Sequence, residues 1–344
     1  MNVPEPPRRV FRADRGDAAR RLDQILVRRL SDLPGLSRTR VQQWIGAGLV
    51  RVNGAPAGRA AEKLGLGDEV EVLLSEAPPQ RPAPSPIPQE IPLAILYEDD
   101  HLLALNKPPG VVVHPTFGHS AGTVLNALLW HLRSRGEESA RPGLVSRLDK
   151  GTSGVMVVAK SGEIHGRLAR AVRSRKVEKE YLAVVYGRAV PPKGRIDRKI
   201  LPDPVDPRRM ITSRTEGRDS STLYERIAES EGEREGLALL RCRLLTGRMH
   251  QIRVHLKSQG LPIVGDPVYG EPRWKGLHDA DLAALCRGFP RQALHAWRLA
   301  FPHPVTGEPM EVVAPVPEDL RELLEAGFKL QAAPSVYFSG RTVP

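Results

Sequence analysis

One carboxylate is a clear candidate for chemistry in the segment VSRLDKGTSGVMVVAK, residues 145–160. Asp149 lies between Arg147 and a Lys-Gly-Thr-Ser-Gly turn, and a run of apolar β-forming residues follows it. Gly151 and Gly154 would let the backbone turn sharply and approach a ligand closely. Carboxylates serve in nucleophilic and acid–base chemistry, but an isolated aspartate in a glycine turn is more often a capping residue.

Two further segments carry side chains that could take part. Tyr181 lies in VEKEYLAVVYG, and Arg248 and Arg253 lie in LLTGRMHQIRVHL. Both segments alternate like strands. In that setting a tyrosine is usually part of the core, and an arginine-rich strand is usually a solvated face. Arg147 and Asp149 share strand parity, which would direct both side chains to one side.

Several familiar kinds of site do not fit this sequence. GTSGV has Val155 where a G-x-S-x-G nucleophile elbow needs its second glycine. The sequence has no G-x-x-x-x-G-K-[ST] phosphate loop and no H-E-x-x-H zinc motif. His250 and His255 are five residues apart on an expected strand, hence on opposite faces, and the two cysteines form no C-x-x-C pair. The sequence therefore predicts no metal site.

Composition sets the broad class. The 344 residues carry a net charge of +11, and 40% of them are hydrophobic. This length predicts roughly two domains, and the charge favours a phosphate-bearing partner, with an arginine-biased solvated surface as the alternative. Cys242 shares the strand parity of Leu240 and Leu244, which predicts a core thiol, and a reducing cytoplasm fits best. Neither a membrane span nor a signal peptide is expected.

The N-terminal part predicts a small helical domain. Residues 1–18 are expected to form a loose polar tail, and residues 19–76 to form two helices followed by short strands. Ser37 is the expected N-cap of the second helix, and Asn53-Gly54 predicts a tight turn. Helical spacing predicts the buried positions, which are Leu22, Ile25, Leu26 and Leu30 in the first helix and Val41, Trp44 and Ile45 in the second.

This first domain resembles the S4 RNA-binding family. The segments RLDQIL, SRTRVQQWIGAGLVRVNG and GDEVEV match that family in order. The resemblance implies that a basic face of the two helices binds RNA phosphate through Arg38, Arg40 and Arg51, with Arg28 and Arg29 as weaker candidates. The alternative is a small helical cap domain with a charged outer face.

The rest of the chain predicts one large domain after a spacer. The proline-rich residues 77–92 are expected to be an extended linker. Residues 93–330 are expected to form a β-rich domain, and residues 331–344 a poorly ordered tail. Strand patterns recur at VMVVAK, EYLAVVYG, STLYERIAES, LALLRCRLL and RMHQIRVHL, and helical patterns at TVLNALLWHL, GEIHGRLARAV and PEDLRELLEAG.

The large domain resembles the RluA-type pseudouridine synthases over nearly its whole length. The resemblance rests on NKPPGVVVHP, SRLDKGTSGVMVVAK, KEYLAVVYG, TGRMHQIRVHL, VGDPVYG and RQALHAWRLAFPHPVTGEPM. With the S4 domain in front, the chain looks most like the members of that family that modify large-subunit ribosomal RNA. The resemblance implies an α+β fold, in which a catalytic domain built on a mixed, mostly antiparallel sheet follows the S4 domain.

The resemblance also implies a mechanism. Such enzymes break the N1–C1′ bond of a uridine, turn the base and rejoin it through C5, an isomerisation that needs no cofactor or metal. Asp149 would be the reacting carboxylate, Arg253 its cationic partner and Tyr181 the ring against the base, which must leave its stack to reach them. The residues implied in substrate binding are Arg147, Arg248, His250 and Gln251. Ser146 stands where the family often has histidine, which leaves the details of base flipping open.

The implied partner is structured RNA, either 23S ribosomal RNA or the assembling large subunit. The chain is expected to act as a monomer in the cytoplasm, without a membrane or a small-molecule cofactor. One alternative is a synthase acting on tRNA or on another ribosomal RNA site, and another is a hydrolase of the same glycosidic bond. An RNA-binding assembly factor is the non-catalytic alternative, but pure binding would not need a carboxylate facing phosphate.

Overall fold

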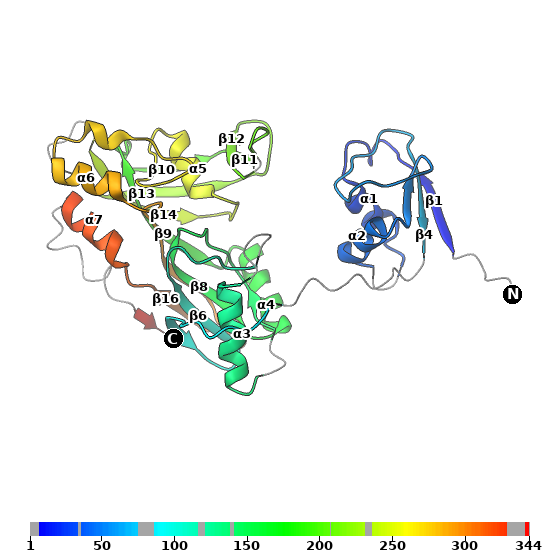
Figure 1. Cartoon of the computed structure of the whole chain (residues 1–344), viewed down its shortest axis with the longest axis horizontal. Coiled ribbons are helices and arrows are strands. Elements are labelled where there is room, and N and C mark those ends of the chain that lie inside the picture. Colours follow the sequence, from blue (N-terminus) through cyan, green and yellow to red (C-terminus); the bar gives the residue numbers. More distant parts are fainter. Residues whose placement is uncertain are drawn as a thin grey trace. The chain divides into compact units, whose positions relative to one another are not determined.

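Two units, residues 1–85 and 86–344, make up the computed structural model, and each is described by itself (Figure 1). The structure describes residues 7–33, 36–74, 86–115, 121–137, 141–206, 208–230, 236–328 and 341–343.

The N-terminal unit packs two helices against a small sheet. All the predicted apolar helix positions are buried, together with alternate residues of the strands. The Ser37 hydroxyl accepts a hydrogen bond from the Arg40 N–H (3.2 Å), which confirms the predicted N-cap. Asn53 and Gly54 have φ of 51° and 82°, as a tight hairpin turn requires. The elements are β1 (Arg8–Arg12), α1 (Leu22–Arg29), α2 (Arg38–Gly46), β2 (Val50–Val52), β3 (Ala55–Pro56) and β4 (Glu69–Leu73), with sheet order β1-β4-β2-β3.

Strand β1 corrects the predicted N-terminal tail. It pairs antiparallel with β4, from Arg8 opposite Leu73 to Arg12 opposite Glu69. Ion pairs of 3.3 Å join Arg8 to Glu71 and Arg12 to Glu69 across this pairing. The strand lies at the edge of the sheet and is mostly exposed. Its sequence therefore has no apolar alternation from which a strand could be recognised.

The second unit is built on a large mixed sheet. The strand order is β10-β13-β14-β9-β15-β8-β6-β5, while β16 pairs with β15 and β17, and β7 pairs with β8. Strands β8 and β15 run parallel, and the other pairs among the described strands are antiparallel, which confirms the predicted α+β class. The strands are β5 (Ile95–Glu98), β6 (Leu102–Lys107), β7 (Gly143–Leu144), β8 (Ser153–Ala159), β9 (Glu178–Tyr186), β10 (Lys193–Asp197), β13 (Ser221–Glu229), β14 (Leu237–Leu244), β15 (Leu294–Pro302), β16 (Pro309–Val313) and β17 (Arg341–Val343), with β11 (Lys199–Pro202) and β12 (Met210–Ser213) in a separate hairpin.

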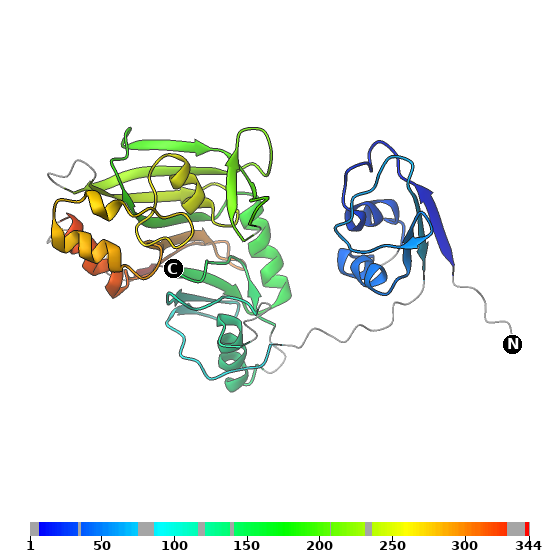
Figure 2. The same ribbon diagram turned by 45° about the horizontal axis from the view of Figure 1, so that its top comes forward.

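Helices flank this sheet in two groups. Figures 1 and 2 show α3 and α4 beside β6 and β8, and α6 and α7 together away from them. The Thr123 side chain and Asn126 form a capping box at the start of α3, and Ser161 caps α4. The bounds are α3 (Val124–Ser134), α4 (Gly162–Arg173), α5 (Gln251–Ser258), the 3₁₀ turn η1 (Arg273–Gly276), α6 (Ala280–Gly288) and α7 (Glu318–Phe328).

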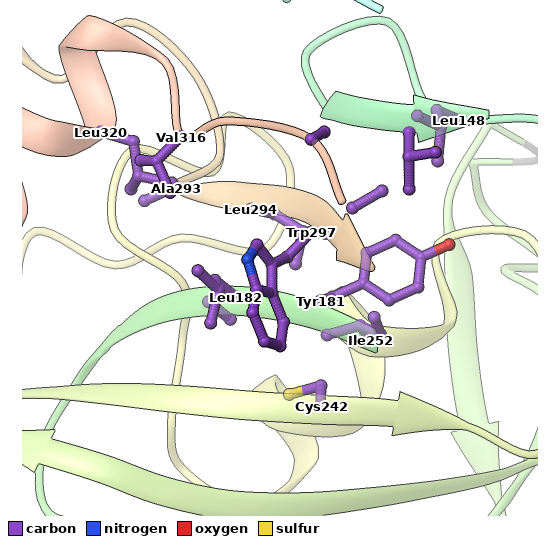
Figure 3. Close-up of a cluster of buried hydrophobic side chains, with 14 of the residues drawn as sticks. Leu148, Tyr181, Leu182, Cys242, Ile252, Ala293, Leu294, Trp297, Val316 and Leu320 are labelled. Carbon is purple, nitrogen blue, oxygen red and sulfur yellow. The ribbon is translucent and has the colours of Figure 1, made fainter. Parts of the chain in front are cut away.

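The core lies along the middle of the sheet. Every residue of β8 is buried, which explains why its sequence is a continuous run of small and apolar residues rather than an alternating one. Cys242 on β14 is fully buried, as its parity predicts, and lies in a cluster with Leu182 and Trp297 (Figure 3). The central strands are therefore rigid supports for whatever side chains their ends carry.

One predicted strand is a helix. RMHQIRVHL forms a loop followed by α5, so His250 and His255 do not lie on opposite faces of a strand. Residues 251–256 are all buried, and the segment therefore lacks the one-sided apolar pattern of an amphipathic helix. His250 is the N-cap residue with φ of 54°, and His255 contacts the Thr222 hydroxyl at 2.9 Å.

The second unit extends beyond its predicted boundaries at both ends. Within the predicted linker, residues 77–85 lie outside the described part. The Asn126 amide donates a hydrogen bond to the Ile87 carbonyl (2.7 Å), which holds the later part of the linker on α3. Within the predicted C-terminal tail, residues 331–340 lie outside the described part. Residues 341–343 form β17 against β16, which corrects the expectation of a disordered segment there.

The parallel pair β8–β15 fixes the loop that carries Asp149. Ser153 lies opposite His295, and Gly154 opposite Ala296. Gly154 has φ of 116°, and a Cβ at this position would lie 2.1 Å from the Ala296 carbonyl oxygen. Only glycine allows the two strands to approach so closely immediately after the loop.

We expect Gly154→Ala to lower the free energy of unfolding by about 2–5 kcal/mol, because the new methyl group combines an unfavourable φ with a backbone clash. Urea unfolding followed by circular dichroism measures this loss. Gly162→Ala is the matched control, since a Cβ there meets nothing within 4 Å and the residue opens helix α4. That variant should stay within about 1 kcal/mol of the parent. Equal stability of the two variants would contradict the close approach.

Candidate active site

A pocket of about 410 Å³ opens beside the loop that carries Asp149. Its wall combines this loop, the start of β9 and the segment around the start of α5. All the site residues predicted for this unit line it, namely Arg147, Asp149, Tyr181, Arg248, His250, Gln251 and Arg253. The fold thus brings Asp149 and Arg253, which are 104 positions apart in the sequence, into one pocket.

Arg253 lies at the centre of this pocket and contacts two carboxylates. Its Nη1 donates to Asp149 Oδ2 at 2.9 Å, while its Nε and Nη2 donate to the two oxygens of Asp266 at 2.7 and 2.8 Å. Burial opposes the charge on Arg253, but the two carboxylates outweigh it and raise the arginine pKa. Burial likewise opposes ionisation of Asp266, yet the hydrogen bonds from Arg253 lower its pKa. The pair is therefore charged at neutral pH.

Asp149 is held through one oxygen only. Oδ2 accepts the hydrogen bond from Arg253, whereas Oδ1 accepts none from the described residues. The side chain is 27% exposed, although its partner Arg253 is 4% exposed. An oriented carboxylate with one unoccupied oxygen can therefore meet a ligand in the pocket, as a nucleophile or a proton acceptor.

Tyr181 supplies an apolar wall of the pocket. It lies on β9, opposite Cys242 on one side and Ala296 on the other. Figure 3 shows its ring near Leu148 and Ile252, with the hydroxyl directed away from Trp297. Burial foremost, and the Asp149 charge in addition, raise the pKa of Tyr181 far above its usual value. Tyr181 is therefore a neutral phenol that can pack against a flat ligand and share its hydroxyl proton.

His250 faces Asp149 from the other side. The Tyr269 hydroxyl accepts a hydrogen bond from the Met210 N–H (2.8 Å) and contacts His250 Nδ1 at 2.9 Å. The hydroxyl can then donate its proton to Nδ1, which leaves the proton of a neutral imidazole on Nε2. Burial foremost lowers the pKa of His250, so the ring is neutral at pH 7. Its Nε2 lies 3.9 Å from Asp149 Oδ2, within reach of a shared ligand.

Gln251 lines the pocket, but its side-chain amide is bonded to other protein groups. Its amide nitrogen donates to the Ser221 carbonyl and to the Thr222 hydroxyl, both at 3.0 Å. Its amide oxygen accepts from the Arg248 N–H (3.0 Å) and the Thr246 hydroxyl (2.8 Å). Both of its donors are therefore occupied, and the side chain ties the loop before α5 to β13 instead of offering a donor to a ligand.

Two arginines at the mouth of the pocket have no carboxylate partner among the described residues. Arg147 is exposed, and residues 146–149 form a loop and not the expected strand. Arg248 donates through Nε to the Asp219 carbonyl oxygen at 3.2 Å and keeps its charge uncompensated. Both side chains nevertheless line the same pocket as Asp149, and Ser146 lines it as well. This arrangement suits an anionic ligand.

Buried side chains from distant segments hold the turn after Asp149. Arg291 is itself anchored to Asp319 by hydrogen bonds of 2.6 and 2.8 Å. Four successive residues of the turn are each bound by a different side chain, namely the Lys150 carbonyl by Lys107 (3.2 Å), the Gly151 carbonyl by Arg291 (3.1 Å), the Thr152 hydroxyl by Gln292 (3.0 Å) and the Ser153 hydroxyl by His295 (2.9 Å). Asp149 is thus positioned by contacts that its own segment cannot supply.

Several of these side chains were not predicted as site residues, although they lie in motifs that carry the family resemblance. Asp266 and Tyr269 belong to VGDPVYG, Lys107 to NKPPG and Arg291 to RQALHA. Lys107 is fully buried, and burial lowers its pKa to about 7, although three carbonyls face its amine. A charged residue inside an otherwise apolar or turn-forming motif is the signal that could have identified them.

The predicted RNA-binding arginines lie on the S4-like unit and differ in their partners. Arg38 donates to Asp23 through Nε (3.0 Å) and Nη2 (2.8 Å). Arg40 lies over the Trp44 ring, 5.5 Å from its centroid, and Arg51 is exposed on β2. Neither Arg40 nor Arg51 forms an ion pair with a described residue. The weaker candidates Arg28 and Arg29 both bind the buried carboxylate of Asp17.

No group of three or more His, Cys, Asp or Glu side chains among the described residues could hold a metal ion. No helix in the described part of the chain is long and apolar enough to cross a membrane.

Comparisons with known proteins cover both units. The family described as RNA pseudouridylate synthase matches residues 101–258, and the S4 domain family matches residues 20–70. The chain is 44% identical to ribosomal large subunit pseudouridine synthase D from Xanthomonas campestris pv. campestris, with 90% of this chain and 89% of the relative covered. Identity to the protein of the same name from Xylella fastidiosa is 45%, with 90% of each covered.

A solved structure shows the same likeness in three dimensions. Human RNA pseudouridylate synthase domain containing 4 is 26% identical and superposes with a TM-score of 0.54. The match covers 67% of this chain and 92% of the human one.

The buried His295, which contacts the Ser153 hydroxyl in the turn after Asp149, predicts a pH dependence of stability. Burial lowers the pKa of His295 to about 4, below its ordinary value of 6.5. Between about pH 6.5 and 4 the unfolded chain binds a proton that the folded chain does not, so the free energy of unfolding falls as the pH falls. We expect His295→Gln to reduce this loss by up to about 1.4 kcal/mol per pH unit. Urea unfolding at pH 7, 6 and 5 measures it. His114→Gln, at an exposed histidine, should keep the parent slope, and an unchanged slope in His295→Gln would refute the assignment.

Proposed function

Since the chain belongs to the RNA pseudouridylate synthase family, we propose that it isomerises uridines of large-subunit ribosomal RNA and that Asp149 is the reacting group. The relatives named ribosomal large subunit pseudouridine synthase D match over nine-tenths of the chain, S4 domain included, which favours that substrate over tRNA. The observation that carries the role of Asp149 is its orientation by Arg253 with one oxygen left unoccupied in the pocket.

The reaction moves the uracil base within one nucleotide. The N1–C1′ bond breaks, a C5–C1′ bond forms, a proton leaves C5 and a proton is taken up at N1, so atoms and charge balance without a co-reactant. Asp149 Oδ1 is the unoccupied oxygen that would contact the ribose or the base. Arg253 holds the other oxygen and balances its charge while the base is detached. No cofactor is therefore proposed.

The remaining pocket residues fit binding of a flipped-out nucleotide. The Tyr181 ring would pack against the uracil face, and its neutral hydroxyl would lie near the proton that moves. His250 would offer its Nε2 proton to the nucleotide beside Asp149. Arg147 and Arg248 would bind phosphates, because both are cations without a carboxylate partner. Gln251 is assigned to holding the loop and not to the RNA.

The S4 domain would supply a second RNA contact. Arg40 and Arg51 are cations without an ion-pair partner, and Arg38 keeps part of its guanidinium exposed beside Asp23. Such side chains bind phosphate without reading sequence. We further propose that the chain acts as a monomer in the reducing cytoplasm, where its two buried free cysteines would stay reduced.

The first test maps pseudouridine in total RNA by carbodiimide treatment and primer extension, in cells that lack this protein. We expect one or more stops in large-subunit ribosomal RNA to disappear and to return with the parent gene. Asp149→Asn should fail to restore them while still binding RNA. Asp100→Asn, at an exposed aspartate, should restore them fully. Loss of a tRNA stop instead would overturn the substrate, and restoration by Asp149→Asn would overturn the role of Asp149.

The second test concerns the S4 domain. We expect the double variant Arg40→Gln/Arg51→Gln to reduce the slope of log affinity against log salt by about 1–2, because each lost phosphate contact removes roughly 0.7–0.9. The matched control is Arg9→Gln/Arg12→Gln, which removes two arginines that are already paired with Asp32 and Glu69. Filter binding of ribosomal RNA between 50 and 300 mM salt measures both slopes. Equal slopes in the two double variants would remove this role.

A further inference from the structure

A second pocket of about 310 Å³ adjoins the catalytic one. The two share Lys179, Arg248 and Gly247 in their linings, so the second continues the first in the direction away from Asp149. It is formed by the end of α4, the start of β9 and the segment from β14 to the loop before α5. Nothing in the proposed reaction uses it.

Lys179 lines both pockets and has no ion-pair partner among the described residues. It lies two residues before Tyr181 on β9, so the two side chains share one face of the strand. Its neighbours Glu178 and Glu180 point to the opposite face, where Glu178 pairs with Arg243 at 2.6 Å and Glu180 lies 3.6 Å from Arg298. The acidic residues next to Lys179 in the sequence are therefore directed away from it, and no described carboxylate pairs with its amine.

Lys179 is half-buried and has no charged partner among the described residues, which is unfavourable for an ammonium group. The surrounding protein lowers its pKa, because burial disfavours the ammonium. A lysine whose only task is solubility extends its amine to water or finds a carboxylate. A Cβ on Gly247 would lie 3.9 Å from the Lys179 Nζ, so the loop passes the amine at a residue without a side chain. This leaves space for a ligand beside the amine.

Further cations surround the same pocket. Arg173 and Arg175 are exposed at the end of α4, and neither forms an ion pair with a described residue. Basic residues at the C-terminal end of a helix interact favourably with the helix dipole, which can account for Arg173 and Arg175. The same interaction does not account for the position of Lys179, which lies on strand β9. No Asp or Glu lines this pocket among the described residues. Arg243 also lines the pocket and is paired with Glu178 at 2.6 Å. Lys179, Arg173, Arg175 and Arg248 have no carboxylate partner among the described residues.

We propose that this second pocket binds the phosphodiester backbone of the RNA strand next to the reacting uridine, with Lys179 as its central contact. The inference deepens the proposed function and rests on it, because a nucleotide held against Tyr181 must continue into a chain of phosphates on each side. The shared lining leads one side of that chain directly past Lys179. Arginine forks and a lysine ammonium both suit phosphate oxygens, and the contact is independent of base sequence.

The test uses full-length protein and a large-subunit ribosomal RNA fragment that contains the mapped uridine. Each linkage within three nucleotides of that uridine is replaced in turn by an uncharged methylphosphonate. Lys179→Gln is compared with Lys176→Gln, and Arg173→Gln with Arg170→Gln. Each control is three residues away, exposed, and equal in the charge removed, but does not line this pocket. Affinity is measured in the Asp149→Asn background, so that binding is read without turnover.

We expect Lys179→Gln to weaken binding about tenfold, and to raise KM more than it lowers kcat in the active enzyme. One methylphosphonate should weaken the parent by a similar factor and have little further effect on Lys179→Gln, since the two changes remove the same contact. Lys176→Gln should remain sensitive to that linkage. The melting temperature of Lys179→Gln should equal or exceed that of the parent, because an unpaired, half-buried charge is lost.

Three outcomes would overturn the proposal. The first is equal affinity of the Lys179→Gln and Lys176→Gln variants, and the second is a purely additive effect of Lys179→Gln and each methylphosphonate. The third is a lower melting temperature of Lys179→Gln with no coupling to any linkage, which would indicate a structural lysine. Failure of the proposed reaction has a different signature. The parent would then form no pseudouridine in the fragment, while coupling between Lys179 and one linkage would still appear in the binding data.

Discussion

A single buried guanidinium has to satisfy two carboxylates, and the site is arranged around that requirement. Arg253 uses two N–H groups on Asp266 and a third on Asp149. Asp266 also accepts the N–H groups of Val268 and Tyr269, at 2.9 and 3.0 Å, which fixes the turn that presents Tyr269 to His250. Removing either carboxylate would leave the others misaligned, because a buried charge tolerates few geometries.

One cation against two carboxylates leaves this set with a negative charge at the bottom of the pocket. The uncompensated cations lie elsewhere, at the mouth with Arg147 and Arg248 and in the adjoining pocket with Lys179. The paired arginines of the S4 domain, such as Arg29 on Asp17, serve the fold instead. The cations thus fall into two groups, those paired with a carboxylate and those without such a partner. The unpaired cations beside the pocket would attract a polyanion toward Asp149, whose charge would otherwise repel it.

The sequence motifs predicted which side chains share a pocket better than they predicted some of the local structure. Asp149, Tyr181 and Arg253 were identified from motifs and do share one pocket, and the buried helix faces of the first unit follow from simple spacing. Helix α5 was not predicted because six consecutive buried residues show no amphipathic period. Strand β1 was missed because an exposed edge strand has no apolar alternation. The occupied amide of Gln251 depends on contacts 29 and 30 residues away, which spacing cannot show.

The parallel pairing of β8 with β15 has a consequence for how the protein matures. The turn after Asp149 depends on Arg291, Gln292 and His295, which lie 140 to 142 positions later in the chain. Arg291 in turn relies on Asp319 of α7. During synthesis the carboxylate therefore emerges long before its supports, and closing such distant contacts is slow. A nascent chain can complete its N-terminal RNA-binding unit early, yet it cannot assemble a competent catalytic loop until nearly its whole length has been made.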